Sequence, residues 1–288
     1  MRILVATDGS ADAANAIEWL AHFPLPADAG VEVVSVVPRP IPHEGLPTPW
    51  KELMERTERG LEEARRRLAK RWPTATARVL YGDPRQAIAE AAYQGGAQLV
   101  VVGARGLGAV SSFLLGSVSL GVARQAPCAV LVCKGAPRPL RTVTIALDGS
   151  PDAAAAFTFF SALPLPTDLA ARVLGVVQPL GRYPSSEAMS HTLVTALKGY
   201  EDGLRQELQR PLHDATQALR PRVRNVVTAT PVGLPAEVIV GDAATNASDL
   251  IVVGARGLGP LKRMLLGSVS ESVLGHAGCP VLVVRQQA

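Results

Sequence analysis

The glycine-rich stretch at residues 101–119 decides how this chain is interpreted, because the same stretch occurs twice. Residues 101–108 read VVGARGLG, and the same eight letters return at residues 252–259. Residues 114–119 read LLGSVS, and these letters return at residues 265–270. Each copy begins with an apolar run typical of a buried strand and ends with Gly-Ser, where a helix is predicted to begin. The chain is therefore an internal repeat.

The repeat extends beyond the glycine-rich loop in both directions. The triplet DGS at residues 8–10 recurs at residues 148–150, an offset of 140, whereas the loop recurs at an offset of 151. The second repeat therefore carries extra residues between these two features. A Pro- and Gly-rich segment around residues 134–140 predicts a linker. We expect two domains, residues 1–137 and 138–288, each long enough to bury its own core.

Strand and helix patterns alternate within each repeat. Apolar runs predict five strands in the first repeat, and helical spacing with helix-start signals predicts four helices between them. The strands are expected at 2–7, 31–37, 76–80, 99–102 and 129–133, and the helices at 11–23, 50–72, 84–94 and 117–125. The second repeat follows the same order from 142–147 to 281–284. Its long helix at about 187–219 contains Pro211, which is expected to break or kink it.

This alternation predicts an α/β fold of two tandem Rossmann-like domains. Strands that are hydrophobic throughout indicate a parallel sheet with helices on both faces. Right-handed crossovers then give a doubly wound sheet of five strands, for which we assume the order 3-2-1-4-5. Ligands bind such sheets beyond the carboxyl ends of the strands, where the strand order reverses. Asp8 follows the first strand and Gly103 ends the fourth, so both are expected at one crevice.

Composition excludes several classes of protein. Hydrophobic residues make up 48% and charged residues 19%, which excludes intrinsic disorder. The net charge of +4 suits an anionic ligand but is too small and scattered for nucleic-acid binding. Three cysteines do not indicate a disulfide framework, and no apolar run approaches the roughly 20 residues of a membrane helix. We expect a cytoplasmic protein without a signal peptide and with neither nucleic acid nor membrane as partner.

The loop has the chemistry of an anion site. In both repeats it reads Gly-x2-Gly-x9-Gly-Ser, starting at Gly103 and at Gly254. Glycines allow close backbone approach and positive φ, and the free amides at a helix N-terminus favour phosphate. Arg105 and Arg256 can add charge-assisted hydrogen bonds. The alternative is structural, with Gly-Ser capping the helix and the other glycines forming turns. Duplication does not decide between these, because duplicated domains start out identical.

Two aspartates complete the pattern, and several familiar enzyme motifs are absent. Asp8 and Asp148 can accept a hydrogen bond from an adenine amino group or a ribose hydroxyl, or form an Asx turn with the following Gly-Ser. The chain has no Gly-x4-Gly-Lys-Ser/Thr and no Cys-x-x-Cys or His-Glu-x-x-His. No metal site built by the protein is therefore expected. No general base accompanies the loop, so we assign no catalytic residue.

At these residues the chain resembles the universal stress protein family, twice over and along essentially its whole length. The loop pattern together with the first-strand aspartate is that of the ATP-binding branch of the family. The resemblance implies the sheet order 3-2-1-4-5, ATP with Mg²⁺ on its phosphates, and a regulatory role in the stress response. It also implies pairing across the last strands, so that residues 130–133 and 281–284 form a pseudo-dimer within one chain. A further homodimer and the protein partner stay open.

The resemblance further implies a set of nucleotide-binding residues in each repeat. The adenine and ribose end would be formed by Ala6, Thr7, Asp8 and Val36, and by Ala146, Leu147, Asp148 and Val176. The ribose and phosphates would be wrapped by Val102, Gly103, Arg105 and Gly106, and by Val253, Gly254, Arg256 and Gly257. The α- and β-phosphates would be held by Gly116, Ser117, Val118 and Ser119, and by Gly267, Ser268, Val269 and Ser270.

The two expected sites differ, and other functions remain open. Leu147 replaces Thr7 beside the aspartate, and the loop carries Ser111-Ser112 in one repeat but Lys262-Arg263 in the other. The segments at 38–50 and 178–186 also differ. The second site should thus be more cationic and less polar at its adenine side. The alternatives are a slow ATPase or autophosphorylating enzyme, and an interaction module that binds AMP or no nucleotide.

Overall fold

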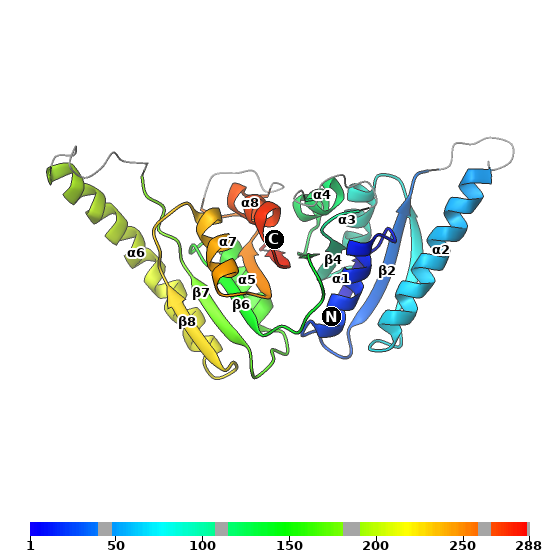
Figure 1. Ribbon diagram of the computed structural model, residues 1–288, viewed down its shortest axis with the longest axis horizontal. Coiled ribbons are helices and arrows are strands. Elements are labelled where there is room, and N and C mark those ends of the chain that lie inside the picture. Colours follow the sequence, from blue (N-terminus) through cyan, green and yellow to red (C-terminus); the bar gives the residue numbers. More distant parts are fainter. Residues whose placement is uncertain (40–47, 107–114, 181–190, 259–265, 287–288) are drawn as a thin grey trace.

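A computed structural model describes residues 1–39, 48–106, 115–180, 191–258 and 266–286 of the chain. Helices and strands alternate in each repeat, as predicted (Figure 1). The first repeat contains β1 (Arg2–Ala6), α1 (Ala11–His22), β2 (Gly30–Val37), α2 (Thr48–Ala69), β3 (Thr76–Tyr81), α3 (Pro84–Gln94), β4 (Leu99–Gly103), α4 (Ser117–Gln125) and β5 (Ala129–Cys133). The second contains β6 (Thr142–Ala146), α5 (Pro151–Ser161), β7 (Ala170–Leu174), α6 (His191–Leu219), β8 (Asn225–Ala229), α7 (Pro235–Thr245), β9 (Leu250–Gly254), α8 (Ser268–His276) and β10 (Val281–Val284).

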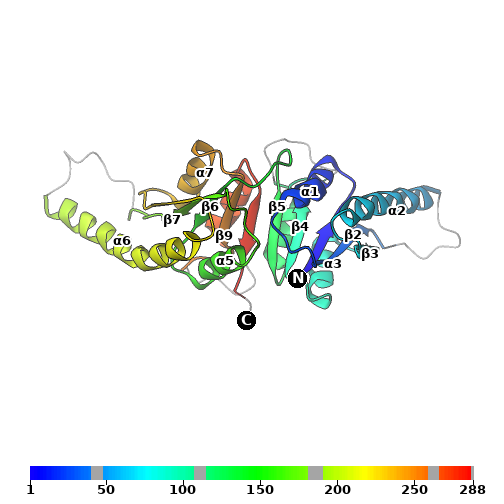
Figure 2. The same ribbon diagram turned by 90° about the horizontal axis from the view of Figure 1, so that it is seen from below.

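The strands of the described residues form one ten-stranded sheet. Their order is β3-β2-β1-β4-β5-β10-β9-β6-β7-β8, which confirms the assumed order 3-2-1-4-5 within each repeat. Pairing inside each repeat is parallel, and β5 and β10 join the repeats as an antiparallel pair in which Leu131 lies opposite Leu282. Figure 2 shows these two strands side by side at the centre of the molecule. The predicted pairing of the last strands is thus confirmed.

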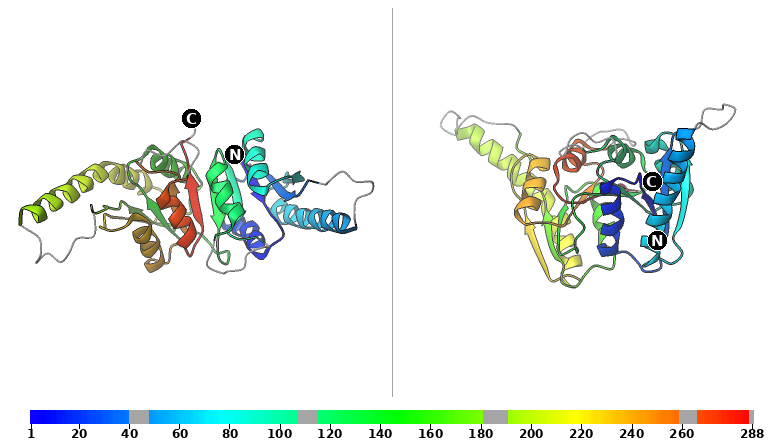
Figure 3. Two further views of the ribbon diagram at one scale, coloured as in Figure 1. Left: turned by 90° about the horizontal axis from the view of Figure 1, so that it is seen from above. Right: turned by 45° about the vertical axis from the view of Figure 1, so that its right-hand side comes forward.

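Helices cover both faces of the sheet, because side chains along a buried strand alternate between two cores. One core packs against α1, α2, α5 and α6, and the other against α3, α4, α7 and α8 (Figure 3). Cys133 belongs to the first core and Cys128 to the second, so the two cysteines lie on opposite faces of the sheet. Among the described residues, no helix is long and apolar enough to cross a membrane.

Helix α6 passes through Pro211 without interruption, so of the expected break or kink, the break does not occur. In Figure 3 (left) the helix curves along its length instead. A proline removes one backbone hydrogen bond but leaves the side chains of neighbouring turns in place. Leu208, Leu212, Ala215 and Leu219 bury one face of α6 against the sheet on both sides of the proline. This burial holds the helix together across the missing hydrogen bond.

Two positively charged side chains link the repeats across the central strand pair. Lys134 follows β5 and Arg285 follows β10, at the offset of 151 that relates the loops. Each side chain donates to carbonyl oxygens in or just after the last turn of a helix of the other repeat, where a cation is favoured. Lys134 donates to the carbonyl oxygen of Leu274 and, at 3.0 Å, to that of Ala277. Arg285 donates to the carbonyl oxygens of Ala123 at 2.8 Å and Arg124 at 3.1 Å.

Candidate functional site

A cavity of about 590 Å³ opens at the carboxyl ends of β6 and β9, between helices α6, α7 and α8. This volume is that of an ordinary small-molecule site. All twelve site residues predicted for the second repeat line it. They are Ala146, Leu147, Asp148, Val176, Val253, Gly254, Arg256, Gly257, Gly267, Ser268, Val269 and Ser270. The doubly wound sheet therefore brings residues from four distant segments to one crevice.

The start of α8 lines this cavity. Gly267 is the N-cap with extended backbone (φ −71, ψ 151), and no side chain of the described residues caps the helix. The amides of the first turn are thus without a side-chain partner, and the helix dipole adds positive potential there. The exposed Ser268 stands at the same point. Gly116 and Ser117 begin α4 in the same way in the first repeat.

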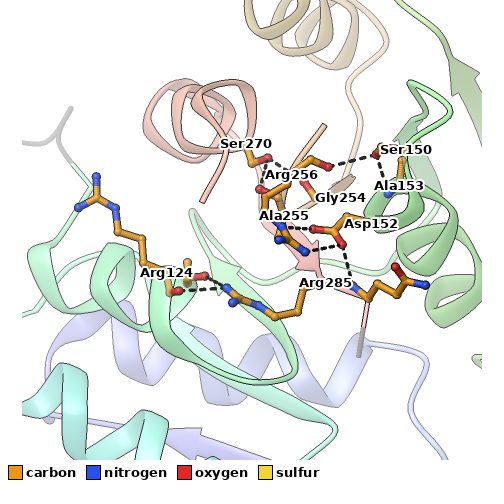
Figure 4. Close-up of polar contacts among 11 residues, drawn as sticks. Arg124, Ser150, Asp152, Ala153, Gly254, Ala255, Arg256, Ser270 and Arg285 are labelled. Atoms are coloured by element: carbon orange, nitrogen blue, oxygen red, sulfur yellow. Dashed lines mark hydrogen bonds and ion pairs between the residues drawn. The ribbon is translucent and has the colours of Figure 1, made fainter. Parts of the chain in front are cut away.

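The hydroxyl groups of Ser119 and Ser270 anchor their helices rather than facing a ligand. Ser270 Oγ lies 2.7 Å from the carbonyl oxygen of Gly254 and 3.0 Å from that of Ala255. Figure 4 shows these contacts at the end of β9. Ser119 makes the equivalent contacts, at 2.8 and 2.9 Å, with Gly103 and Ala104. Both serines are buried, so their hydroxyls fix the helix start against the strand end.

The guanidinium groups of the loop bind aspartates of the protein itself. Arg256 donates to Asp152 at 2.9 and 3.2 Å, and Asp152 also accepts the Gln286 amide at 2.9 Å (Figure 4). Arg105 donates to Asp12 in the same way, at 2.7 and 3.2 Å. The family resemblance implied that these arginines contact ribose and phosphates. The structure shows their side chains at the first turns of α1 and α5, while Arg256 still lines the cavity.

The ion pair at Asp152 is electrostatically tight because the carboxylate is almost fully buried. Burial opposes its charge, but the hydrogen bonds from Arg256 and the Gln286 amide outweigh that effect, and the pKa of Asp152 is lowered. The hydrogen bonds that Arg256 makes to Asp152 raise the pKa of Arg256. Both groups are therefore charged at neutral pH. The pair fastens the glycine-rich loop of the second repeat to α5 and to the residues that follow β10.

The motif glycines are required by close packing. A Cβ on Gly254 would lie 2.5 Å from the backbone nitrogen of Ala153, and a Cβ on Gly257 would lie 2.5 Å from Oδ2 of Asp148. Among the described residues, positive φ occurs at other glycines, such as Gly149 (φ 80), and at none of the motif. The expected use of positive φ in the loop is therefore wrong for these positions. Bare backbone is needed so that strand, helix and aspartate can meet.

Asp148 forms the predicted Asx turn and also faces the cavity. Its Oδ1 accepts the amide of Ser150 at 2.9 Å, and its Oδ2 lies beside Gly257. The same turn occurs in the first repeat, where Asp8 accepts the amide of Ser10 at 3.0 Å. The structural and the ligand-binding interpretations of this aspartate are thus compatible, because different oxygen atoms serve them.

The contacts of the described first-repeat residues follow those of the second repeat. Val36 is partly buried late in β2, and Val102 is buried near the end of β4 in the same core as Ala6. The hydroxyl of Thr7 accepts the amide of Gly9 at 3.2 Å, a contact that Leu147 cannot make in the second repeat. The expected differences at Ser111-Ser112 and Lys262-Arg263, and most of both variable segments, lie outside the described residues.

Comparison with known proteins agrees with this architecture. Residues 1–134 and 139–285 each match the model of the universal stress protein family. The chain belongs to the universal stress protein family. The universal stress protein Rv2005c of Mycobacterium tuberculosis is 30% identical over 303 residues, covering 99% of this chain and 97% of that protein. A universal stress protein structure from Archaeoglobus fulgidus has a TM-score of 0.69 at 22% identity, covers 100% of this chain and 98% of its own, and shares the fold.

One wall of the cavity in this universal stress protein was missed by sequence reasoning. Helix α6 lines it with Tyr200, Leu204, Glu207 and Leu208. Their spacing places them on one helical face, which continues as the buried face through Leu212. The apolar periodicity of α6 was a signal for this face. What the pattern did not indicate is that the sheet ends beneath the first half of the helix and leaves the face open to the cavity.

Proposed function

We propose that this chain binds ATP, with Mg²⁺ on the phosphates, and acts as a nucleotide-dependent regulatory protein. The observation that carries the proposal is that the uncapped start of α8 and an apolar cleft lie in the same cavity. A ligand that fits must have an anionic end and a flat apolar end. An adenine nucleotide has both, and a second site is expected at the equivalent place in the first repeat.

The roles of the residues follow from the position of each within the cavity. The amides of Gly267 and Ser268, with the Ser268 hydroxyl, would hold phosphate oxygens at the positive end of α8. The apolar side chains of Leu174, Val176 and Ile239 would pack against the base. Asp148 would accept a hydrogen bond from the ribose or the base.

Magnesium is expected to reach the site on the nucleotide. Among the described residues, no group of three or more His, Cys, Asp or Glu side chains could hold a metal ion. The phosphates themselves are good Mg²⁺ ligands, and the ion usually keeps several waters in such sites. Mg²⁺ would then neutralise phosphate charge while the helix start supplies directed amides.

A regulatory role fits the site better than catalysis. Phosphoryl transfer needs positioned cations around the transferred group. The guanidinium of Arg256 is held by Asp152 at the first turn of α5, which leaves the amides of α8 as the anion-binding groups of the described cavity. Bound ATP would be sensed through the conformation of the loop and recognised by a protein partner. Repeated phosphate release by purified protein would instead support the ATPase alternative.

The proposal is tested by ATP binding to wild type and to a double variant, Gly116→Val with Gly267→Val. A side chain on Gly267 would meet the Ala255 carbonyl at 3.2 Å and obstruct the helix start. Wild type should be stabilised by about 2.7 kcal/mol at 100 times its Kd, and the double variant should not. Gly241→Ala on α7 is the control, because a Cβ there meets nothing within 4 Å. Equal ATP affinity in wild type and double variant would refute the proposal.

A further inference from the structure

The face of α6 that lines the cavity carries one charged residue, Glu207. Its neighbours on that face are Tyr200, Leu204 and Leu208. Tyr200 is 41% exposed, whereas Leu208 is 7% exposed, so the face changes from open to buried along the helix. Glu207 makes no hydrogen bond or ion pair within the part of the chain that the structure describes. Glu207 is exposed, so its carboxylate is a solvent-accessible acceptor at the edge of the cavity.

Charge within the cavity gives a ligand a preferred direction. The charged side chains among the described lining residues are Asp148, Glu207 and Arg256. Arg256 is neutralised by Asp152, so the remaining side-chain charge is negative. The start of α8, which also lines the cavity, supplies positive potential. An anionic group belongs at α8, and a hydrogen-bond donor belongs near the carboxylates.

The equivalent position in the first repeat reverses this charge. The buried residues Leu61 and Leu68 of α2 correspond to Leu212 and Leu219 of α6 at the offset of 151, so the two helices are in register. Glu207 then corresponds to Arg56. A guanidinium has donors and no acceptor, whereas a carboxylate has acceptors and no donor. The two repeats thus present opposite hydrogen-bonding groups at this place on their second helix.

We propose that Glu207 determines base specificity in the second repeat by accepting a hydrogen bond from an amino group on the edge of the base. This inference rests on the proposed function, because it requires the base to lie at the α6 side of the cavity. An ionised acceptor makes a stronger hydrogen bond than a neutral one. The second site should therefore discriminate between purine nucleotides that carry an amino group and those that do not. The first site, with Arg56, should not do so in this way.

The test uses full-length protein with Gly116→Val. This substitution obstructs the site of the first repeat, so that binding to the second site is measured. Affinities for ATP and for purine riboside triphosphate, which lacks the 6-amino group, are measured by calorimetry. ATP should bind at least about tenfold more tightly. Glu207→Ala should abolish this preference, Glu207→Gln should reduce it, and Glu207→Arg should disfavour ATP. The control is Asp214→Ala, an exposed carboxylate of α6 that does not line the cavity.

The outcomes separate this inference from the proposed function. If ATP binds but purine riboside triphosphate binds equally well, or if Glu207→Ala keeps the preference, the role of Glu207 is refuted and nucleotide binding stands. If neither nucleotide binds, the proposed function itself fails. GTP is the third probe, because guanine carries a 2-amino group and an adjacent N–H. GTP binding that exceeds ATP binding and is lost in Glu207→Ala would support Glu207 as the acceptor with guanine as the base.

Discussion

Replacing Asp152 by asparagine tests whether the buried ion pair holds the second loop in place. The Asp152 side chain is 4% exposed and accepts two hydrogen bonds from Arg256 and one from the Gln286 amide. Breaking a buried pair costs about 3–5 kcal/mol when the remaining charge is fully buried. The Arg256 side chain is 24% exposed and can be partly hydrated. We therefore expect Asp152→Asn to lower the free energy of unfolding by about 2–3 kcal/mol.

The assay is urea unfolding at pH 7, with the matched variant Asp12→Asn in the first repeat. Within the described residues, Asp12 receives its hydrogen bonds from Arg105, and both side chains are more exposed, at 15% and 33%. Asp12→Asn should therefore cost about 1 kcal/mol, close to an exposed pair. Equal losses in the two variants, or a loss below about 0.5 kcal/mol for Asp152→Asn, would refute the argument from burial.

The same pair predicts a pH dependence. Because the pKa of Asp152 is lowered in the folded state, its contribution is complete above the unfolded carboxyl pKa of about 3.9. It is lost as the pH falls through the lower folded value. The stability difference between wild type and Asp152→Asn should thus stay constant from pH 7 to about pH 5 and decline below about pH 4. A difference that grows on acidification would contradict the assignment.

Three further predictions follow from the packing. Gly254→Ala should cost about 1–3 kcal/mol in urea unfolding, because the clash is with backbone, whereas Gly257→Ala should keep stability and lower ATP affinity by displacing Asp148. Arg285→Met should lower the Tm more than Arg220→Met, an exposed arginine just after α6, because Arg285 holds the end of α4; equal Tm values would contradict this. Burial raises the pKa of Cys128 to about 12 and that of Cys279 to about 11, so iodoacetamide should label these thiols at pH 8 after unfolding and hardly at all before it.

The repeat and the alternation of strands and helices could be predicted because each depends on local pattern, whereas the strand order was assumed and, like the strand pairing between repeats, was implied by the family resemblance. Buried strands such as Leu99–Gly103 are apolar throughout, and Gly116 and Ser117 mark a helix start whatever surrounds them. The position of the crevice follows from the strand order. These features needed no knowledge of how side chains pack.

The partners of individual side chains could not be predicted in this way. Arg256 belongs to a motif typical of phosphate-binding sites, yet its guanidinium binds Asp152. This contact is possible because the bare backbone of Gly254 lets the first turn of α5 approach. Ser270 anchors the helix start for a similar reason. Helix α6 lines the cavity because this long helix extends past the sheet. The presence of Pro211 in the sequence did not indicate that arrangement. Such contacts form when segments distant in the sequence pack together, so the local periodicity of the sequence does not indicate them.

Calorimetric titration of ATP into wild type and into Gly267→Val tests the central claim most directly. The claim is that the start of α8 holds the phosphates of a nucleotide in the cavity of the second repeat. We predict saturable binding to wild type and the loss of one binding site in Gly267→Val, with unchanged binding to Gly241→Ala. The same isotherm for wild type and Gly267→Val, or no heat for wild type at millimolar ATP, would contradict the account.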